Sequence, residues 1–180
     1  TGGYTRSFYT DNDYINTYIG QGAGRNATGS ANLFIGVNSG YSNISGSSNT
    51  FVGQNAGFGN INGNYNTFTG VQSGYKNTAG YNNSFYGYLS GFGDTIGFGN
   101  SFFGYQSGFN TNTSHSILIG DSTGYNNTGN KVVIIGSEAG TNNTGNKSII
   151  IGDSAGYSNT GAGAIMIGEK AGYSNGDSAS

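Results

Sequence analysis

The chain has 180 residues, among them 36 Gly, 14 Tyr and 11 Phe, and it contains no Pro, Cys or Trp. With only 8% charged residues and a formal net charge of −2, it offers no basic surface for nucleic acid. The absence of Cys excludes a disulfide framework and thiolate metal sites. No apolar run approaches the roughly 20 residues that span a bilayer, so we expect no membrane insertion. We also expect no cofactor.

Internal repeats dominate the sequence from residue 16 onward. A short unit, made of a usually apolar residue, Gly, two variable residues, a small residue and Gly, occurs ten times at intervals of 16 or 17 residues. The first glycines of the units, which define coils 1 to 10 below, are Gly20, Gly36, Gly53, Gly70, Gly87, Gly104, Gly120, Gly136, Gly152 and Gly168. We expect them to form structural turns, because glycine adopts the positive φ angles that tight corners require. A unit this short cannot bury its own apolar side chains, so stacked copies must form a solenoid.

Within each coil, the pattern predicts a strand before the first Gly, a tight turn, a short second strand, and a far turn rich in Asn and Gly. The residue two positions before the first Gly is large and apolar in every coil, and the residue three positions after it is small. A large side chain facing a small one suits the thin core of a narrow coil. The sequence therefore predicts an all-β fold, a parallel β-solenoid of ten coils of 16–17 residues.

In chain order, the sequence divides into three parts. Residues 1–15 lack the repeat, and we expect them to cap the first coil or to pair with a neighbouring subunit, because solenoid ends are bare sheet edges. Residues 16–113 form the aromatic-rich coils 1–6, and residues 114–180 form the aliphatic-rich coils 7–10. Asn recurs at the strand entrance of coils 1–6 and at the far turn, where we expect stacked side-chain amides to form ladders.

The residue directly before the first Gly points away from the core if alternate strand residues face opposite sides. It is apolar or aromatic in nine of the ten coils, and an apolar stripe along a whole rod exceeds what a monomer usually exposes. We therefore predict an oligomer with an interface formed by Ile19, Ile35, Val52, Ile119, Ile135, Ile151 and Ile167. A wider coil that folds both sets of residues inside is the alternative. End-to-end stacking of solenoid ends into a filament is a competing mode of assembly.

An aromatic residue occurs five positions after the first Gly in eight coils. If these side chains point inward, they belong to the core; if they point outward, they form a stacking ladder suited to sugar rings. The candidates for glycan contact are Tyr41, Tyr75, Tyr125, Tyr157 and Tyr173. Ice binding by a flat Thr face is a further alternative, although the row that contains Thr17 and Thr50 is interrupted by Leu33.

Residues suited to catalysis are few. His115 is the only His, so with no Cys present neither a catalytic triad nor a zinc site is expected. Asp153 and Glu169 occupy equivalent places in adjacent coils, about 5 Å apart by the strand spacing, which would suit a retaining glycosidase. Nearby Lys147 and Lys170 favour a solvated ladder of charges instead. We expect no catalytic residue and no metal site, and a carbohydrate-active enzyme is the alternative from a different class.

Units such as NTFVGQNAGFGNINGNY and SIIIGDSAGYSNTGAG resemble the Gly/Asn-rich repeats of bacterial and phage surface fibres. They are also similar to the head repeats of trimeric autotransporter adhesins. The resemblance covers roughly residues 14–176 and implies a left-handed parallel β-roll, with three chains around one axis, outside the cell or on a virion surface. On this basis we expect a structural module of an extracellular fibre, filament or adhesin. Its expected partners are copies of itself, as a homotrimer or an end-to-end polymer, and surface glycans.

Overall fold

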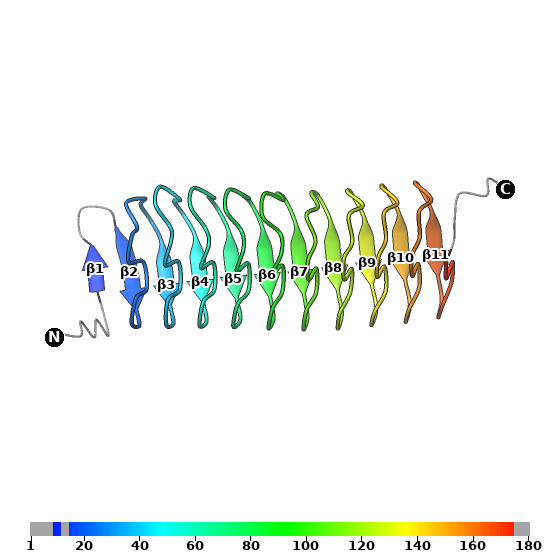
Figure 1. The fold of residues 1–180 in the computed structure, drawn as a ribbon, viewed down its shortest axis with the longest axis horizontal. Helices are drawn as coiled ribbons and strands as arrows, with labels where there is room; N and C mark the ends of the chain where they lie inside the picture. Colours follow the sequence, from blue (N-terminus) through cyan, green and yellow to red (C-terminus); the bar gives the residue numbers. More distant parts are fainter. Residues whose placement is uncertain (1–8, 12–14, 175–180) are drawn as a thin grey trace.

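The computed structural model describes residues 9–11 and 15–174, which form a single rod-shaped β-solenoid (Figure 1). Eleven strands pair side by side in one sheet, in the order of the chain. They are β1 (Tyr9–Asp11), β2 (Asn16–Ile19), β3 (Leu33–Ile35), β4 (Thr50–Val52), β5 (Thr67–Thr69), β6 (Ser84–Tyr86), β7 (Ser101–Phe103), β8 (Ile117–Ile119), β9 (Val133–Ile135), β10 (Ile149–Ile151) and β11 (Ile165–Ile167). Within the described residues there is no helix.

The strands β2 to β11 run parallel, and each pairs with the next at the same position of its coil. Phe34 of β3 lies opposite Phe51 of β4, and Ile134 of β9 lies opposite Ile150 of β10. The segments between strands stack as well, since their backbone N–H groups donate to carbonyls of the adjacent coil, as from Gly40 N to Ala56 O at 2.9 Å. The predicted all-β parallel solenoid is thus confirmed.

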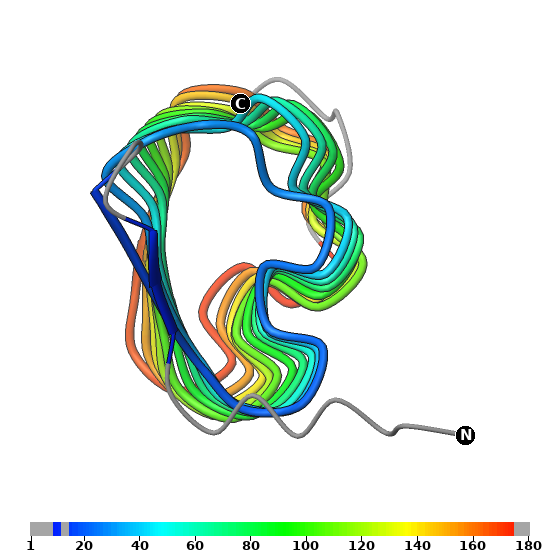
Figure 2. The same cartoon turned by 90° about the vertical axis from the view of Figure 1, so that its left-hand side faces the viewer.

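The rest of each coil consists of turns and bends, so the predicted short second strand is wrong. In coil 2 the first glycine, Gly36, has a φ of 131°, Asn38 a φ of 56° and Gly40 a φ of 58°, and these three positions have positive φ in every coil. Backbone at such φ values cannot continue a strand, which requires negative φ. The wall opposite the sheet therefore folds in and out, as the end-on view shows (Figure 2).

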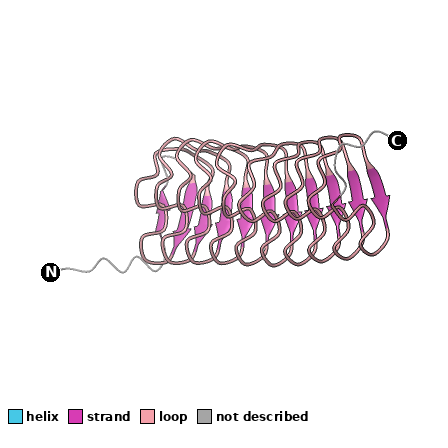
Figure 3. Ribbon diagram, turned by 45° about the vertical axis from the view of Figure 1, so that its right-hand side comes forward, coloured by secondary structure: helices cyan, strands magenta, loops and turns pink. Residues whose placement is uncertain are grey.

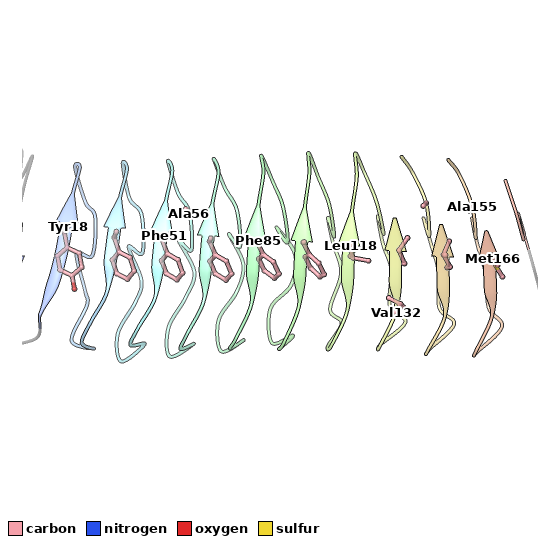
Figure 4. Packing of buried hydrophobic residues seen from close by; sticks show 14 residues of the cluster. Tyr18, Phe51, Ala56, Phe85, Leu118, Val132, Ala155 and Met166 are labelled. Atoms are coloured by element: carbon pink, nitrogen blue, oxygen red, sulfur yellow. The ribbon is translucent and has the colours of Figure 1, made fainter. Parts of the chain in front are cut away.

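A single column of large side chains, one from each of β2 to β11, forms the centre of the core (Figure 4). This core column consists of Tyr18, Phe34, Phe51, Phe68, Phe85, Phe102, Leu118, Ile134, Ile150 and Met166. In coils 1–6 its consecutive rings stack with centroids 4.6–5.3 Å apart. The small residues after the first glycine, such as Ser39, Ala56 and Ala155, are buried as well. Each buried large side chain contributes roughly 1.5–3 kcal/mol, so the column is the main apolar source of stability.

The strand β1 pairs antiparallel with β2, with Tyr9 opposite Tyr18 and Asp11 opposite Asn16. It belongs to segment 1–15, of which residues 1–8 and 12–14 lie outside the described part of the chain. β1 occupies the backbone edge of β2, which would otherwise be a template for another strand. At the far end of the described sheet, β11 pairs with β10 alone.

Candidate interaction surface

One side of the rod is a continuous parallel sheet, and turns make up the other sides (Figure 3). In each strand, the residues before and after the core residue point outward. Phe51, for example, is fully buried, whereas Thr50 and Val52 on either side of it are partly exposed. These outward residues form two lines along the rod, which we call the leading outer row (Thr50 and its equivalents) and the trailing outer row (Val52 and its equivalents). The predicted apolar stripe is the trailing outer row, so it lies outside the core and not within a wider coil.

The trailing outer row includes all seven residues predicted to form an interface. Five of them are half-buried, namely Ile19, Ile35, Val52, Ile135 and Ile151. The other two are more open, with Ile119 39% and Ile167 67% exposed. Because the strands pair in register, all seven lie on the same face of the sheet.

Both outer rows are aliphatic in coils 7–10. The residues concerned, which we call the aliphatic face, are Ile117, Ile119, Val133, Ile135, Ile149, Ile151, Ile165 and Ile167. Their exposed fractions include 41% for Ile117 and 71% for Ile165. Parallel sheets that are apolar on both faces are normally covered on both faces, and a contiguous exposed apolar patch marks an interaction site. The sequence analysis located the trailing half of this face, and the described part of the chain leaves the face partly exposed.

In coils 1–6 the outer face is more polar. The leading outer row is small or hydroxylated at five of six positions, being Thr17, Leu33, Thr50, Thr67, Ser84 and Ser101. The trailing outer row changes from aliphatic residues in coils 1–3 to Thr69, Tyr86 and Phe103 in coils 4–6. The rings of Tyr86 and Phe103 stack with centroids 4.9 Å apart. The outer face is therefore graded along the rod, and its large and small side chains occupy separate rows in coils 5 and 6.

The charged residues two positions outside the strands have opposite signs on the two sides of the aliphatic face, and Lys170, next to Glu169, adds one positive charge to the acidic side. Asp121, Asp153 and Glu169 follow their strands by two residues, and all three are exposed. Lys131 and Lys147 precede their strands by two residues and are also exposed. The sequence shows these charges gathered in the last four coils, but only the strand bounds separate them into an acidic flank and a basic flank.

The aromatic residues five positions after the first Gly form a stacked ladder on another side of the rod. The rings of Tyr41, Phe58, Tyr75, Phe92, Phe109 and Tyr125 stack at centroid separations of 5.1–5.2 Å. After a break at Thr141, Tyr157 and Tyr173 stack at 4.9 Å.

Most ring faces in this ladder are already occupied, which matters for the five predicted glycan contacts. Tyr75 lies between Phe58 and Phe92, and the Arg25 guanidinium lies 5.6 Å from the ring centroid of Tyr41. Stacking of a sugar needs a free ring face. Tyr41, Tyr75, Tyr125 and Tyr157 are half-buried and Tyr173 is 53% exposed, so mainly ring edges face solvent.

Asparagines at the strand entrance bind adjacent coils to each other. They are Asn16, Asn32, Asn49, Asn66, Asn83 and Asn100, all buried. Each Oδ1 accepts the backbone N–H of the equivalent residue in the next coil at 2.7–3.0 Å. Each Nδ2 donates to a far-turn carbonyl at 2.6–2.9 Å. A buried amide costs free energy unless both ends are paired, and here the stacking supplies both partners.

A second buried column lies at the far turn and contains one acid. It consists of Asn43, Asn60, Asn77, Asp94, Thr111, Asn127, Asn143 and Asn159. The Asp94 carboxylate accepts the Gly97 N–H at 2.8 Å and the Asn100 Nδ2 at 3.0 Å. Burial raises the pKa of Asp94 from 3.8 to about 7, although the bonds from Gly97 and Asn100 act in the opposite direction. We had not singled out Asp94 from the sequence, where the available signal was an acid at a position otherwise filled by Asn or Thr.

The three residues considered for catalysis all lie at the surface. His115 is exposed, with a φ of 57°, and its ring meets Phe98 edge to face at 4.8 Å. Asp153 and Glu169 are exposed, and Glu169 lies 3.7 Å from Lys170. Within residues 9–11 and 15–174, no three His, Cys, Asp or Glu side chains come close enough together to hold a metal ion.

No helix in the described part of the chain has the length and apolar character needed to cross a membrane. Comparisons of the chain with protein-family models, curated proteins and solved structures found no match.

Proposed function

We propose that the protein is a structural module that associates with further copies of itself through the outer face of its sheet. The observation that carries this proposal is the aliphatic face, eight β-branched side chains on four adjacent strands of a parallel sheet. Cover by a like surface would remove these side chains from water, and area of this kind contributes roughly 25 cal/mol per Å². The resemblance of the repeat units to surface-fibre repeats supports an extracellular fibre, filament or adhesin as the setting.

The size of the sheet indicates how much of it must take part. A strand of three residues is about 10 Å long and ten strands span about 48 Å, so the outer face measures roughly 480 Å² per copy. Two such faces bury about 1,000 Å² in total, near the lower limit for a specific interface, whereas the aliphatic face alone gives about 400 Å². The association therefore needs the whole length of the sheet, with the aliphatic face as its most apolar part.

Lateral association is favoured over end-to-end stacking. A head-to-tail filament would place β11 of one copy against β2 of the next, but β1 occupies that edge of β2. End stacking would first have to displace β1, which costs its backbone hydrogen bonds. No comparable obstacle covers the outer face of β2 to β11 among the described residues.

Sedimentation velocity at micromolar concentration tests the proposal. The wild-type chain is expected to sediment as a small discrete oligomer. The double variant Ile135→Lys, Ile151→Lys places two charges on the outer face and is expected to sediment as a monomer with unchanged circular dichroism. The matched control is Ile44→Lys, Ile61→Lys, since these residues are 50% and 43% exposed at the far turn, away from the sheet. A monomeric wild-type protein would refute self-association, as would equal effects of the two double variants.

A further inference from the structure

We infer that two copies pack face to face with their rods parallel, so that each coil lies opposite the same coil of the other copy. The two-fold axis relating them runs along the rods, over the core column. This inference rests on the proposed self-association and adds the stoichiometry, direction and register of the contact. Three independent features of the outer face support it: side-chain volume, charge and the grading of polarity.

The symmetry fixes which residues meet. A two-fold rotation about an axis along the rods keeps every coil at its height and reverses the strand direction, so the leading outer row of one copy faces the trailing outer row of the other. In coil 9, Ile149 then faces Ile151 of the second copy. If the rods ran in opposite directions, the two-fold axis would lie along the strands. Each outer row would then face itself, and coil 1 would lie opposite coil 10.

Side-chain volumes favour the parallel arrangement. In coils 5 and 6 the leading outer residues are Ser84 and Ser101, and the trailing ones are Tyr86 and Phe103. In the parallel pair each large ring faces a small Ser, which allows close packing. In the antiparallel pair coil 5 faces coil 6, so Tyr86 would meet Phe103 while Ser84 met Ser101. The two large rings would clash in one row, and the two small Ser side chains would leave a gap in the other.

The two charged flanks also favour the parallel arrangement. Reversal of the strand direction places the acidic flank of one copy beside the basic flank of the other, at the same height along the rod. In coil 9 this brings Asp153 toward Lys147 of the second copy, and both residues are exposed at the rim of the sheet. In antiparallel rods shifted until the aliphatic faces meet, Asp121 would instead lie opposite Glu169, and Lys131 opposite Lys147, of the second copy. Like charges facing each other across an interface oppose association.

The grading of polarity excludes the remaining choices. Antiparallel rods with full overlap would lay coils 7–10 on coils 4–1 and so bury Ile117, Val133 and Ile165 against Thr67, Thr50 and Thr17, respectively. Antiparallel rods shifted until the aliphatic faces met would keep only four coils in contact, with roughly 400 Å² buried in total, which is the size of a crystal-packing contact. Parallel rods in register match the aliphatic faces and also use all ten strands.

Cysteine cross-linking tests this arrangement, and the chain has no native Cys to interfere. Two single variants, Lys147→Cys and Asp153→Cys, are refolded together and treated with a mild oxidant. The parallel two-fold pair predicts a disulfide-linked dimer from the mixture and none from either variant alone, because identical positions lie on opposite flanks. Nitroxide labels at Gln21→Cys and, separately, at Glu169→Cys supply a second measurement. Both inter-label distances should fall well below the roughly 43 Å, nine strand spacings, that full antiparallel overlap requires.

The outcomes separate the two proposals. A monomer in sedimentation overturns self-association itself. A dimer that gives no mixed cross-link, or that has a long inter-label distance at either end, overturns the parallel register and leaves self-association standing. A trimer likewise overturns the two-fold contact, because in a three-fold ring each copy must offer two different surfaces.

Discussion

The side-chain amide of Asn77 is turned the opposite way round from that of Asn60 in the coil before it. Asn60 Nδ2 donates to Asn43 Oδ1 at 2.6 Å, and Asn143 and Asn159 repeat this direction. Asn77 Nδ2 instead donates to the main-chain oxygen of Asp94 at 3.2 Å. As a result, Asn60 Oδ1 and Asn77 Oδ1 are buried and accept no hydrogen bond from any residue that the structure describes. The reversal occurs next to Asp94, whose carboxylate, when ionised, has no hydrogen to donate to Asn77 Oδ1, whereas an Asn side chain at this position has one.

Replacement of Asp94 by Asn should stabilise the protein at high pH more than at low pH. The pKa of Asp94 rises from 3.8 to about 7 in the folded protein. Between these values the folded state holds a proton that the unfolded state has lost, so the free energy of unfolding falls by about 1.4 kcal/mol per pH unit and levels off above the folded pKa. Asp94→Asn does not titrate and can continue the amide ladder, so its advantage over the wild type should grow between pH 4 and pH 7.

Urea unfolding of wild type and Asp94→Asn at pH 5 and pH 8 measures this difference. The exposed Asp121 provides the control Asp121→Asn, for which we expect a small effect at both pH values. A gain from Asp94→Asn of the same size at pH 5 and pH 8 would contradict the raised pKa.

Two glycines at the same place of different coils should respond differently to Ala. Gly136 has a φ of +136°, and an added Cβ would overlap the carbonyl oxygen of Gly152 in the next coil. Gly168 has a φ of +126°, but no atom of residues 9–11 or 15–174 outside its immediate chain neighbours lies within 4 Å of its added Cβ. Gly168→Ala should cost only backbone strain, about 1–3 kcal/mol, and Gly136→Ala clearly more, because the coils must also move apart. Thermal unfolding compares the two, and equal losses would show that coil spacing does not depend on glycine.

Truncation of one ring in the core column should be costly. Phe68 stacks between Phe51 and Phe85 with both centroid separations at 4.8 Å and is fully buried. Phe68→Ala should lower the free energy of unfolding by about 3–5 kcal/mol. Phe68→Leu should cost less than about 1.5 kcal/mol, because Leu118 fills the same place in coil 7. Chemical denaturation of both variants measures the losses, and a Leu variant as unstable as the Ala variant would mean that ring stacking outweighs burial.

Some residues adopt a backbone conformation that suits glycine better. Glu138 is exposed and has a φ of 53°, a left-handed conformation that costs a side-chain-bearing residue roughly 1 kcal/mol. Glu138→Gly should therefore be neutral or stabilising by up to about 1 kcal/mol. Ser137, whose φ is not positive, is the adjacent control, and Ser137→Gly should destabilise through the added freedom of the unfolded chain. The difference in unfolding midpoint between the two variants is the readout, and its reversal would refute the assignment.

The repeat made the strands and the core predictable. The column from Tyr18 to Met166, the small residues such as Ala56 and the corner glycines such as Gly136 recur at fixed offsets, and stacking brings equal offsets together. The same regularity places the predicted interface residues on one face. The association of copies through this face and the left-handed coiling of the chain stay predictions.

Features that leave no pattern of residue types in the sequence could not be predicted from it. The prediction of a second strand in each coil was wrong because residues such as Leu89 and Glu138 adopt positive φ. Stacking on the neighbouring coils imposes this conformation against the preference of these residues. The sequence analysis expected residues 1–15 to cap the first coil or to pair with a neighbouring subunit, but it did not predict that residues 9–11 form a strand antiparallel to β2. The raised pKa of Asp94 arises from its burial beneath neighbouring coils, so it required the position of the acid in the stack.

Because β2 to β11 pair in register, the number of coils sets the length of the rod. Each coil meets only the coil before it and the coil after it, at matching positions, so removal of residues 137–152 would join Gly136 to Asp153 and leave every remaining position with a neighbour of its own kind. Such a deletion shortens the rod by one strand spacing, about 4.8 Å. The length of the rod can therefore change by whole coils. Duplication or loss of one repeat unit lengthens or shortens the rod without any new type of contact between coils.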